Sequence, residues 1–172
     1  MWWSRRQALA SILAACGLSA CGFEPMYGGR RGRVTSAELA AIKVEPIPDR
    51  VGQVLRNGLL DRLTPTGEPA RPRYKLRVKV VQTTTALAIQ PNASVTRFNL
   101  SLDVSFTLFD LADGKPLYRD HTRVVGSYNA VRSDFATVVT QQDTAQRAAR
   151  EASQEVSTLL GVFFARRRAS AS

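Results

Sequence analysis

The sequence predicts an α+β fold, a two-layer sandwich in which two helices pack on one face of a four-stranded mixed sheet, in the order βαβββα. Four segments alternate between apolar and polar residues, and two others repeat apolar residues at helical spacing. The apolar faces of the sheet and helices must cover each other, so the sheet's other face stays polar. We place this domain at residues 39–165 of the 172-residue chain.

The domain opens with a short strand and a helix. Residues 42–47 alternate between apolar and polar and include Pro46, which predicts a strand at an edge of the sheet. Asp49 is suited to be the N-cap of the following helix. Apolar residues then recur at helical spacing as far as Leu63, so we expect an amphipathic helix over residues 49–63.

The next segment has the clearest two-residue pattern in the chain. From Arg73 to Val80, apolar side chains occupy the even positions and cations the odd ones, which puts four cations on one face of a strand. Beyond Val81 the apolar residues move to odd positions. We therefore expect a bulge, or an end of strand pairing, within residues 82–85.

Two further strands and two turns complete an antiparallel meander. Apolar and polar residues alternate from Phe98 to Leu108, and a fourth strand follows over residues 117–128. Turn-forming residues at 91–94 and 112–115 separate these strands.

The last element is a long helix. Ser133 and Asp134 are suited to cap it, and a helical stripe of apolar residues continues to about Phe164. Alanine dominates the middle of this stripe, so the helix can approach its partner closely. Residues 166–172, which begin with three arginines, are expected to form a flexible basic tail.

The N-terminus has the features of a bacterial lipoprotein signal peptide. Arg5 and Arg6 precede an apolar segment that is too short to span a bilayer, and Ser19 and Ala20 are small residues directly before Cys21. We expect cleavage after residue 20 and attachment of a lipid to Cys21. Residues 21–38 then form a tether, because glycine, proline and arginine without periodicity occupy positions 22–33.

Other interpretations of this segment stay open. Cys16 also follows two small residues, although cleavage there leaves an apolar core of only about eight residues. An ordinary secretory signal, or a cytosolic chain with an apolar start, is also consistent with the pattern. Arg5 and Arg6 weakly match a twin-arginine signal, so the export route is open as well.

Charge and cysteine content narrow the function classes. The chain has a net charge of +10, and removal of residues 1–20 leaves 22 basic and 14 acidic residues, a net charge of +8. Nucleic acid is the usual partner of a basic domain, but an exported chain rarely meets it. Both cysteines lie in the signal region, so neither a disulfide framework nor a structural zinc site is expected.

The sequence offers little for catalysis. His121 is the only histidine, and it lies between arginines on a strand, where a surface role is more common than that of a general base. The aspartates lack the paired spacing of an acid and a base, and no glycine-rich phosphate loop follows a strand. We expect neither enzymatic activity nor a cofactor or metal.

Four short motifs carry a resemblance to a known family: CGFEPMYG at residues 21–28, DRVGQ with LRN at 49–57, SYN at 127–129 and DTAQRAA at 143–149. Together they span nearly the whole processed chain and resemble the LptE family of lipopolysaccharide-assembly lipoproteins in its alphaproteobacterial form. Met26 departs from this pattern, which more often has leucine there.

This resemblance implies a specific role. Members of the family are anchored by lipid in the outer membrane, on its periplasmic face, and are not enzymes. They occupy the lumen of the β-barrel LptD, help it to assemble, and assist delivery of lipopolysaccharide to the cell surface. Gly22, directly after the lipidated cysteine, is similar to lipoproteins that are forwarded to the outer membrane.

The basic strand offers candidate contacts for lipopolysaccharide phosphates, because charge-assisted hydrogen bonds are roughly twice as strong as neutral ones. The candidates are Arg73, Lys75, Arg77, Lys79 and Arg97, with weaker support for Arg119 and Arg123. The alternative is a solvated strand face whose cations prevent edge pairing.

Two other function classes remain as alternatives. An auxiliary lipoprotein of a phospholipid-transport system can share a small α+β domain, although the CGF and SYN motifs argue against it. A nucleic-acid-binding module is supported only by the basic strand. Co-purification discriminates between these classes: a large barrel, an inner-membrane transporter or nucleic acid would each identify one of them.

Overall fold

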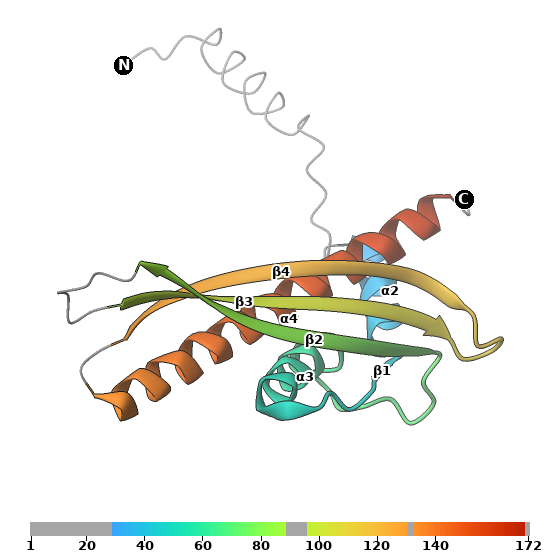
Figure 1. The fold of residues 1–172 in the computed structure, drawn as a ribbon. Coiled ribbons are helices and arrows are strands. Elements are labelled where there is room, and N and C mark those ends of the chain that lie inside the picture. The colour runs from blue at the N-terminus through green and yellow to red at the C-terminus, as the bar shows by residue number, and fades with distance from the viewer. Residues whose placement is uncertain (1–28, 89–95, 131–132, 171–172) are drawn as a thin grey trace, which may run out of the picture.

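The computed structural model describes residues 29–88, 96–130 and 133–170, which form a mixed sheet covered by helices (Figure 1). Strand β1 is parallel to β2, whereas β2, β3 and β4 form an antiparallel meander. The strands lie in the order β1-β2-β3-β4, so β1 and β4 are the two edges. Their bounds are β1 Ile42–Val44, β2 Tyr74–Ala88, β3 Thr96–Asp110 and β4 Pro116–Ala130.

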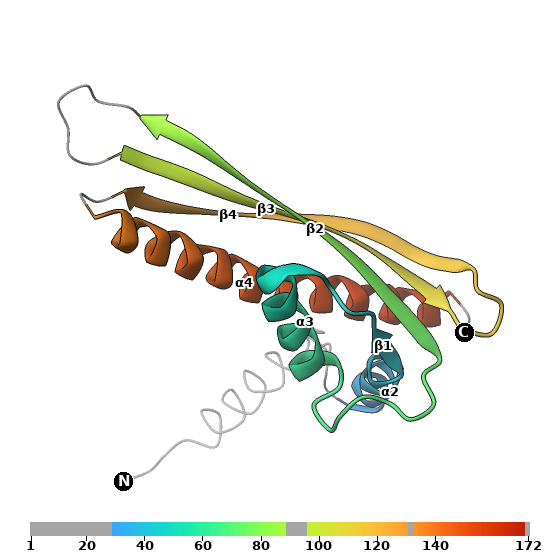
Figure 2. The same ribbon diagram turned by 60° about the horizontal axis from the view of Figure 1, so that its bottom comes forward.

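All described helices lie on one side of the sheet (Figure 2). Helix α3 (Asp49–Leu63) supplies the crossover that the parallel pair β1 and β2 requires, and α4 (Asp134–Ala169) runs beneath β3 and β4. The predicted two-layer α+β sandwich is confirmed. A helix that the sequence analysis did not predict, α2 (Gly29–Ala40), precedes β1.

The core lies between the sheet and the helices. The predicted alternation is confirmed on β2 and β3, where the even-numbered side chains are buried from Tyr74 to Val78 and from Leu100 to Leu108. These side chains meet the leucines of α3 and the apolar stripe of α4. The residues that α3 and α4 contribute are Leu55, Leu59, Leu63, Ala145, Ala148, Ala149, Ala152, Val156, Leu160 and Phe164.

Helix α4 packs closely, as its alanine stripe predicts. Ser133 is its N-cap and accepts a hydrogen bond from the backbone N–H of Ala136 at 3.4 Å, which confirms the predicted cap. A β-carbon on Gly126 of β4 would come within 2.6 Å of the Thr144 methyl group. Small residues on both elements therefore allow α4 to approach the sheet.

The start of the described chain differs from the sequence analysis. No regular structure was predicted for residues 22–33, and this prediction is wrong from Gly29 onward because α2 begins there. Two glycines and the β-branched Val34 and Thr35 give this segment little local helix preference. Packing against α4 stabilises it instead: Thr35 and Leu39 are buried, and Arg168 of α4 donates a hydrogen bond to the Thr35 hydroxyl at 3.1 Å.

The end of α4 also differs from the prediction. The arginines at 166–168 were expected in a flexible tail, but α4 continues to Ala169, so this expectation is wrong up to that residue. The Arg168 bond to Thr35 ties this last turn to α2. Cations here are also favourable because they lie near the negative end of the helix dipole.

Helix α3 has the predicted bounds, but its N-cap lies one residue earlier than predicted. Asp49 is the first residue of the helix, with φ of +66°, and Pro48 holds the N-cap position without a side-chain hydrogen bond. Asp49 is therefore not the N-cap, but its carboxylate lies in the first turn, where negative charge is favourable.

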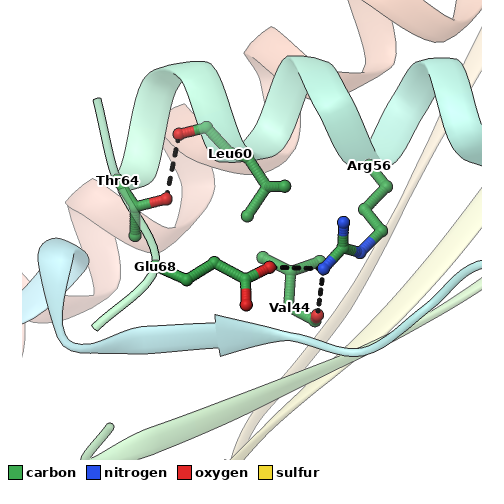
Figure 3. Close-up of polar contacts among 5 residues, drawn as sticks. All are labelled: Val44, Arg56, Leu60, Thr64 and Glu68. Carbon is green, nitrogen blue, oxygen red and sulfur yellow. Dashed lines mark hydrogen bonds and ion pairs between the residues drawn. The ribbon is translucent and has the colours of Figure 1, made fainter. Parts of the chain in front are cut away.

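Arg56 of α3 joins three parts of the fold (Figure 3). Its guanidinium donates to the Val44 carbonyl of β1 at 3.4 Å and forms an ion pair with Glu68, which lies in the loop after α3. At the end of the helix, the Thr64 hydroxyl donates to the Leu60 carbonyl at 3.1 Å. These contacts hold the crossover against β1.

The predicted bulge lies elsewhere in β2. Residues 82–85 pair continuously with β3, and the register shifts between Ala86 and Ala88. The change of phase after Val81 needs no bulge because residues 81–87 are all exposed. This end of the strand has no core face that would enforce alternation.

Several predictions fall on residues outside the described ranges. These are the signal peptide, Cys16, Cys21 and the turn at 91–94. The turn at 112–115 is described, and Gly114 takes a positive φ there and donates its N–H to the Asp110 carbonyl at 3.0 Å. Among the helices of the described residues, none has the length and apolar character to span a bilayer.

Candidate functional site on the outer face of the sheet

The face of the sheet that no described helix covers is polar and basic. Strand register aligns its side chains in rows across β2, β3 and β4: one row contains Arg77, Thr107 and Arg119, and the next contains Lys79, Ser105 and His121. Alternation therefore gathers cations from β2 and β4, which are not adjacent, on one rigid surface.

Glu45, directly after β1, partly neutralises the basic strand. Its carboxylate accepts a hydrogen bond from Arg77 Nε at 2.8 Å and lies 3.3 Å from Lys75 Nζ. The hydrogen bond from Arg77 is the main reason why the pKa of Glu45 is lowered, and the bond from Lys75 adds to it. Two of the predicted phosphate contacts thus already have an anionic partner.

An aromatic ring supports the same two cations. Lys75 Nζ lies 5.6 Å and the Arg77 guanidinium 5.1 Å from the centre of the Phe109 ring on β3, within the range of cation–π attraction. Arg73 lies 3.4 Å from Glu38 and 5.2 Å from the Tyr74 ring. The positions of these three cations are therefore fixed by their neighbours.

Lys79 and Arg119 are exposed, and within the described ranges neither forms an ion pair. They flank Thr107 and Ser105 from opposite strands. Arg123, four residues beyond Arg119 on β4, is paired with Asp103. Lys79 and Arg119 are thus the cations of this face best placed to bind an added anion.

The structure does not bring all predicted contact residues together. Arg73 lies directly before β2, and Lys75, Arg77 and Lys79 lie along its first half. Arg97 lies opposite Ala88, nine residues from Lys79. At 3.3 Å per residue this separation is about 30 Å. Arg97 therefore belongs to the other end of the face.

The sequence analysis missed Glu45 and Phe109 as parts of this site. Glu45 precedes Arg77 by 32 positions, and only the parallel pairing of β1 with β2 makes them neighbours. Phe109 is at an odd position after a run of buried even ones, and this phase was a signal that it lies on the outer face.

The arrangement suits binding. The His121 side chain is 83% exposed, and its Nδ1 lies 4.0 Å from the Asp120 carboxylate. In the part of the chain that the structure describes, no three histidine, cysteine or acidic residues lie close enough to hold a metal ion. The site offers guanidinium, ammonium and hydroxyl groups on an open surface, which are donors for phosphate oxygens.

The fold and this face define the class of protein, a small α+β domain in which one face of the sheet is uncovered and basic. The chain belongs to the LptE family, described as lipopolysaccharide-assembly, whose family model matches residues 39–160. The predicted family is confirmed, and membership supports a role in lipopolysaccharide assembly.

Relatives agree with this assignment. A protein of Rickettsia prowazekii (strain Madrid E), described as uncharacterized, is 30% identical over 156 residues, covering 91% of this chain and 96% of the relative. A crystal structure from Caulobacter crescentus CB15, described as a lipoprotein, matches with a TM-score of 0.64 and 24% identity, covering 77% of this chain and 97% of that one. The Acinetobacter baumannii minor lipoprotein matches with a TM-score of 0.55 and 20% identity, covering 70% and 90%. These two structures share the fold.

Proposed function

We propose that the protein is a lipid-anchored lipoprotein of the outer membrane that occupies the lumen of an LptD-type β-barrel from the periplasmic side. Its outer sheet face meets lipopolysaccharide on the way to the cell surface. Family membership supports the pathway. The lipid on Cys21 holds the domain at the membrane, and the protein acts by binding and positioning without catalysing a reaction.

One observation carries the proposal: an open sheet face whose rows combine cations and hydroxyls across three strands. Large transmembrane barrels have polar, water-filled interiors, so a domain with a polar face fits inside one without burying unpaired groups. Cations held on a sheet can meet the phosphates of lipid A without first being ordered, which lowers the entropy cost of binding.

The contact is divided among the basic residues. Lys79 and Arg119 bind phosphate first, because no described anion neutralises them. Lys75 and Arg77 contribute by exchanging the Glu45 carboxylate for phosphate. Arg73 precedes them along the same strand direction and lies at the end of this line of cations. Arg97 provides a separate contact at the far end of the face.

The test is a titration of the purified protein with lipopolysaccharide. Reversal of Lys79 and Arg119 to Glu should weaken binding at least tenfold, since each charge-assisted hydrogen bond contributes roughly 1.5–3 kcal/mol. This pair leaves the Glu45 ion pairs intact, which reversal of Lys75 and Arg77 would not. Arg50→Glu with Arg62→Glu, exposed on α3, is the matched control. If the Lys79 and Arg119 variant binds lipopolysaccharide as tightly as the control variant and the native chain do, the proposed phosphate contact is refuted.

The anchor is tested by metabolic labelling with palmitate. Cys21→Ser should abolish the label and leave an unprocessed precursor, whereas Cys16→Ser should be labelled and processed normally. Label that persists in the Cys21 variant would show that the site is wrong.

Co-purification from outer membranes tests the partner. We expect a large β-barrel to come with the tagged protein. Recovery of an inner-membrane transporter in its place would favour the phospholipid-transport alternative, and recovery of nucleic acid would favour a nucleic-acid-binding module.

A further inference from the structure

The three arginines at the end of α4 lie apart from the candidate face and play no part in the proposed function. They lie beside α2, where the described chain begins. Arg168 donates to Thr35 of α2 at 3.1 Å, and Thr35 is six residues, or about 9 Å of helix, from Gly29. The end of α4 and the start of α2 therefore form one end of the molecule.

The proposed anchor keeps this end near the membrane. Cys21 precedes Gly29 by eight residues, which span at most about 28 Å when fully extended. Helix α4 has 36 residues and is about 54 Å long, so its first turn lies well beyond this reach. Of the two ends of α4, the arginine end is the one held next to the leaflet.

This end is strongly basic, and Glu38, which lines a hollow together with Arg167 and Arg168, is ion-paired with Arg73. Arg166 and Arg167 are exposed, and none of the ion pairs among the described residues includes either of them. A leaflet with anionic phosphate groups attracts such a cluster, at about 1 kcal/mol per cation near the surface.

Aromatic side chains line the same hollow as two of the arginines. A hollow of about 410 Å³ is lined by Tyr118, Val162, Phe163, Arg166, Arg167 and Ser170. The rings of Tyr118 and Phe163 stack at 4.7 Å, and Phe163 contacts the Phe164 ring at 5.2 Å. Arginines and half-buried aromatic rings around one hollow are a combination suited to a membrane interface, where one side is apolar and the other polar.

We propose that this end, formed by Arg166, Arg167, Tyr118 and Phe163, is a membrane-docking surface that binds phosphate head groups of the phospholipid leaflet. The inference rests on the proposed anchor, which brings the surface to the leaflet. Guanidinium groups bind phosphate through paired hydrogen bonds, so the contact holds the domain in one orientation. The other end of α4 then points away from the leaflet.

The test uses residues 21–172 with Cys21→Ser, which lack the lipid but contain every core residue. The probes are vesicles of phosphatidylcholine alone and of phosphatidylcholine mixed with phosphatidylglycerol, measured by co-sedimentation. The native chain should bind only the anionic vesicles, and high salt should release it. Arg166→Gln with Arg167→Gln should bind them about 25-fold more weakly, about fivefold for each lost cation.

Controls separate docking from general charge and from loss of structure. The double variant keeps Arg168 and its bond to Thr35, so α2 and α4 stay joined. Arg50→Gln with Arg62→Gln removes the same charge from α3 and should change vesicle binding by no more than about threefold. Equal losses in the two double variants, or no loss in either, would overturn the proposal.

A parallel titration with lipopolysaccharide identifies the source of the phosphate. Arg166→Gln with Arg167→Gln should bind lipopolysaccharide as the native chain does. Loss of lipopolysaccharide binding with unchanged vesicle binding would overturn the docking surface. Failure of the outer-face proposal gives a different result, in which Lys79→Glu with Arg119→Glu keeps full affinity for lipopolysaccharide.

Discussion

At the scale of single residues, Glu45 governs the charge of the basic strand. Its carboxylate contacts both Lys75 and Arg77, and the Phe109 ring positions the same two cations. Local pattern was enough to predict that β2 places cations on its outer face. It could not reveal this anionic partner, because the contact depends on strand pairing between distant segments.

This ion pair should be visible in the pH dependence of stability. The pKa of Glu45 is lower in the folded chain than its ordinary value of 4.5, mainly through the hydrogen bond from Arg77. The pair therefore stabilises the fold above that value and stops doing so as the pH falls through the lowered pKa. Arg77→Gln should reduce the free energy of unfolding slightly at neutral pH and not at acidic pH, measured by urea unfolding.

Arg71→Gln is the control for this measurement, because Arg71 is exposed and has no ion pair among the described residues. It should show no such pH-dependent difference. A difference between Arg77→Gln and the native chain that stays constant from neutral to acidic pH would contradict the role assigned to Glu45.

At the scale of elements, helical stripes predicted α3 and α4, but no stripe predicted α2. The reason is physical: α2 is held by Thr35 and Leu39 against α4, and its own sequence favours a helix only weakly. The last turn of α4 escaped prediction for the same reason, since its contact is with α2. Elements that depend on each other are hard to predict from either sequence alone.

Close packing of α4 against β4 makes Gly126 a sensitive position. Gly126→Ala should destabilise the fold by about 1–3 kcal/mol, because the new β-carbon meets the Thr144 methyl group at 2.6 Å. Thr144→Ser removes that methyl and retains the hydroxyl, which donates to the Thr140 carbonyl at 2.9 Å. The double variant should recover most of the lost stability in urea unfolding. If it is as unstable as Gly126→Ala, the clash is not the cause.

At the scale of the whole molecule, the division into a buried and a polar sheet face was predictable because strand alternation fixes it. How far the core extends along each strand was not predictable. The C-terminal half of β2 shows no alternation, because residues 81–87 are exposed on both faces. Which cations lie together also needed the register, which separates Arg97 from the others.

The core should survive without α2. A chain that begins at residue 39 keeps every core residue from Leu39 to Phe164 and loses only Thr35 among the buried positions described before it. We expect one cooperative urea transition, with coincident fluorescence and circular dichroism curves, at a lower midpoint than that of the chain from residue 21. Non-coincident curves for the shortened chain would show that the rest of the fold unfolds as one cooperative unit only when α2 is present.

The two edges of the sheet are unequal, with three residues in β1 and fifteen in β4. Backbone groups on an edge strand can pair with another strand, and a long edge does so more readily than a short one. Two copies joined through β4 would each retain only the β1 edge, which is too short to recruit a third. Polymerisation by strand addition would therefore terminate at a dimer, and fibrils could not grow from this edge.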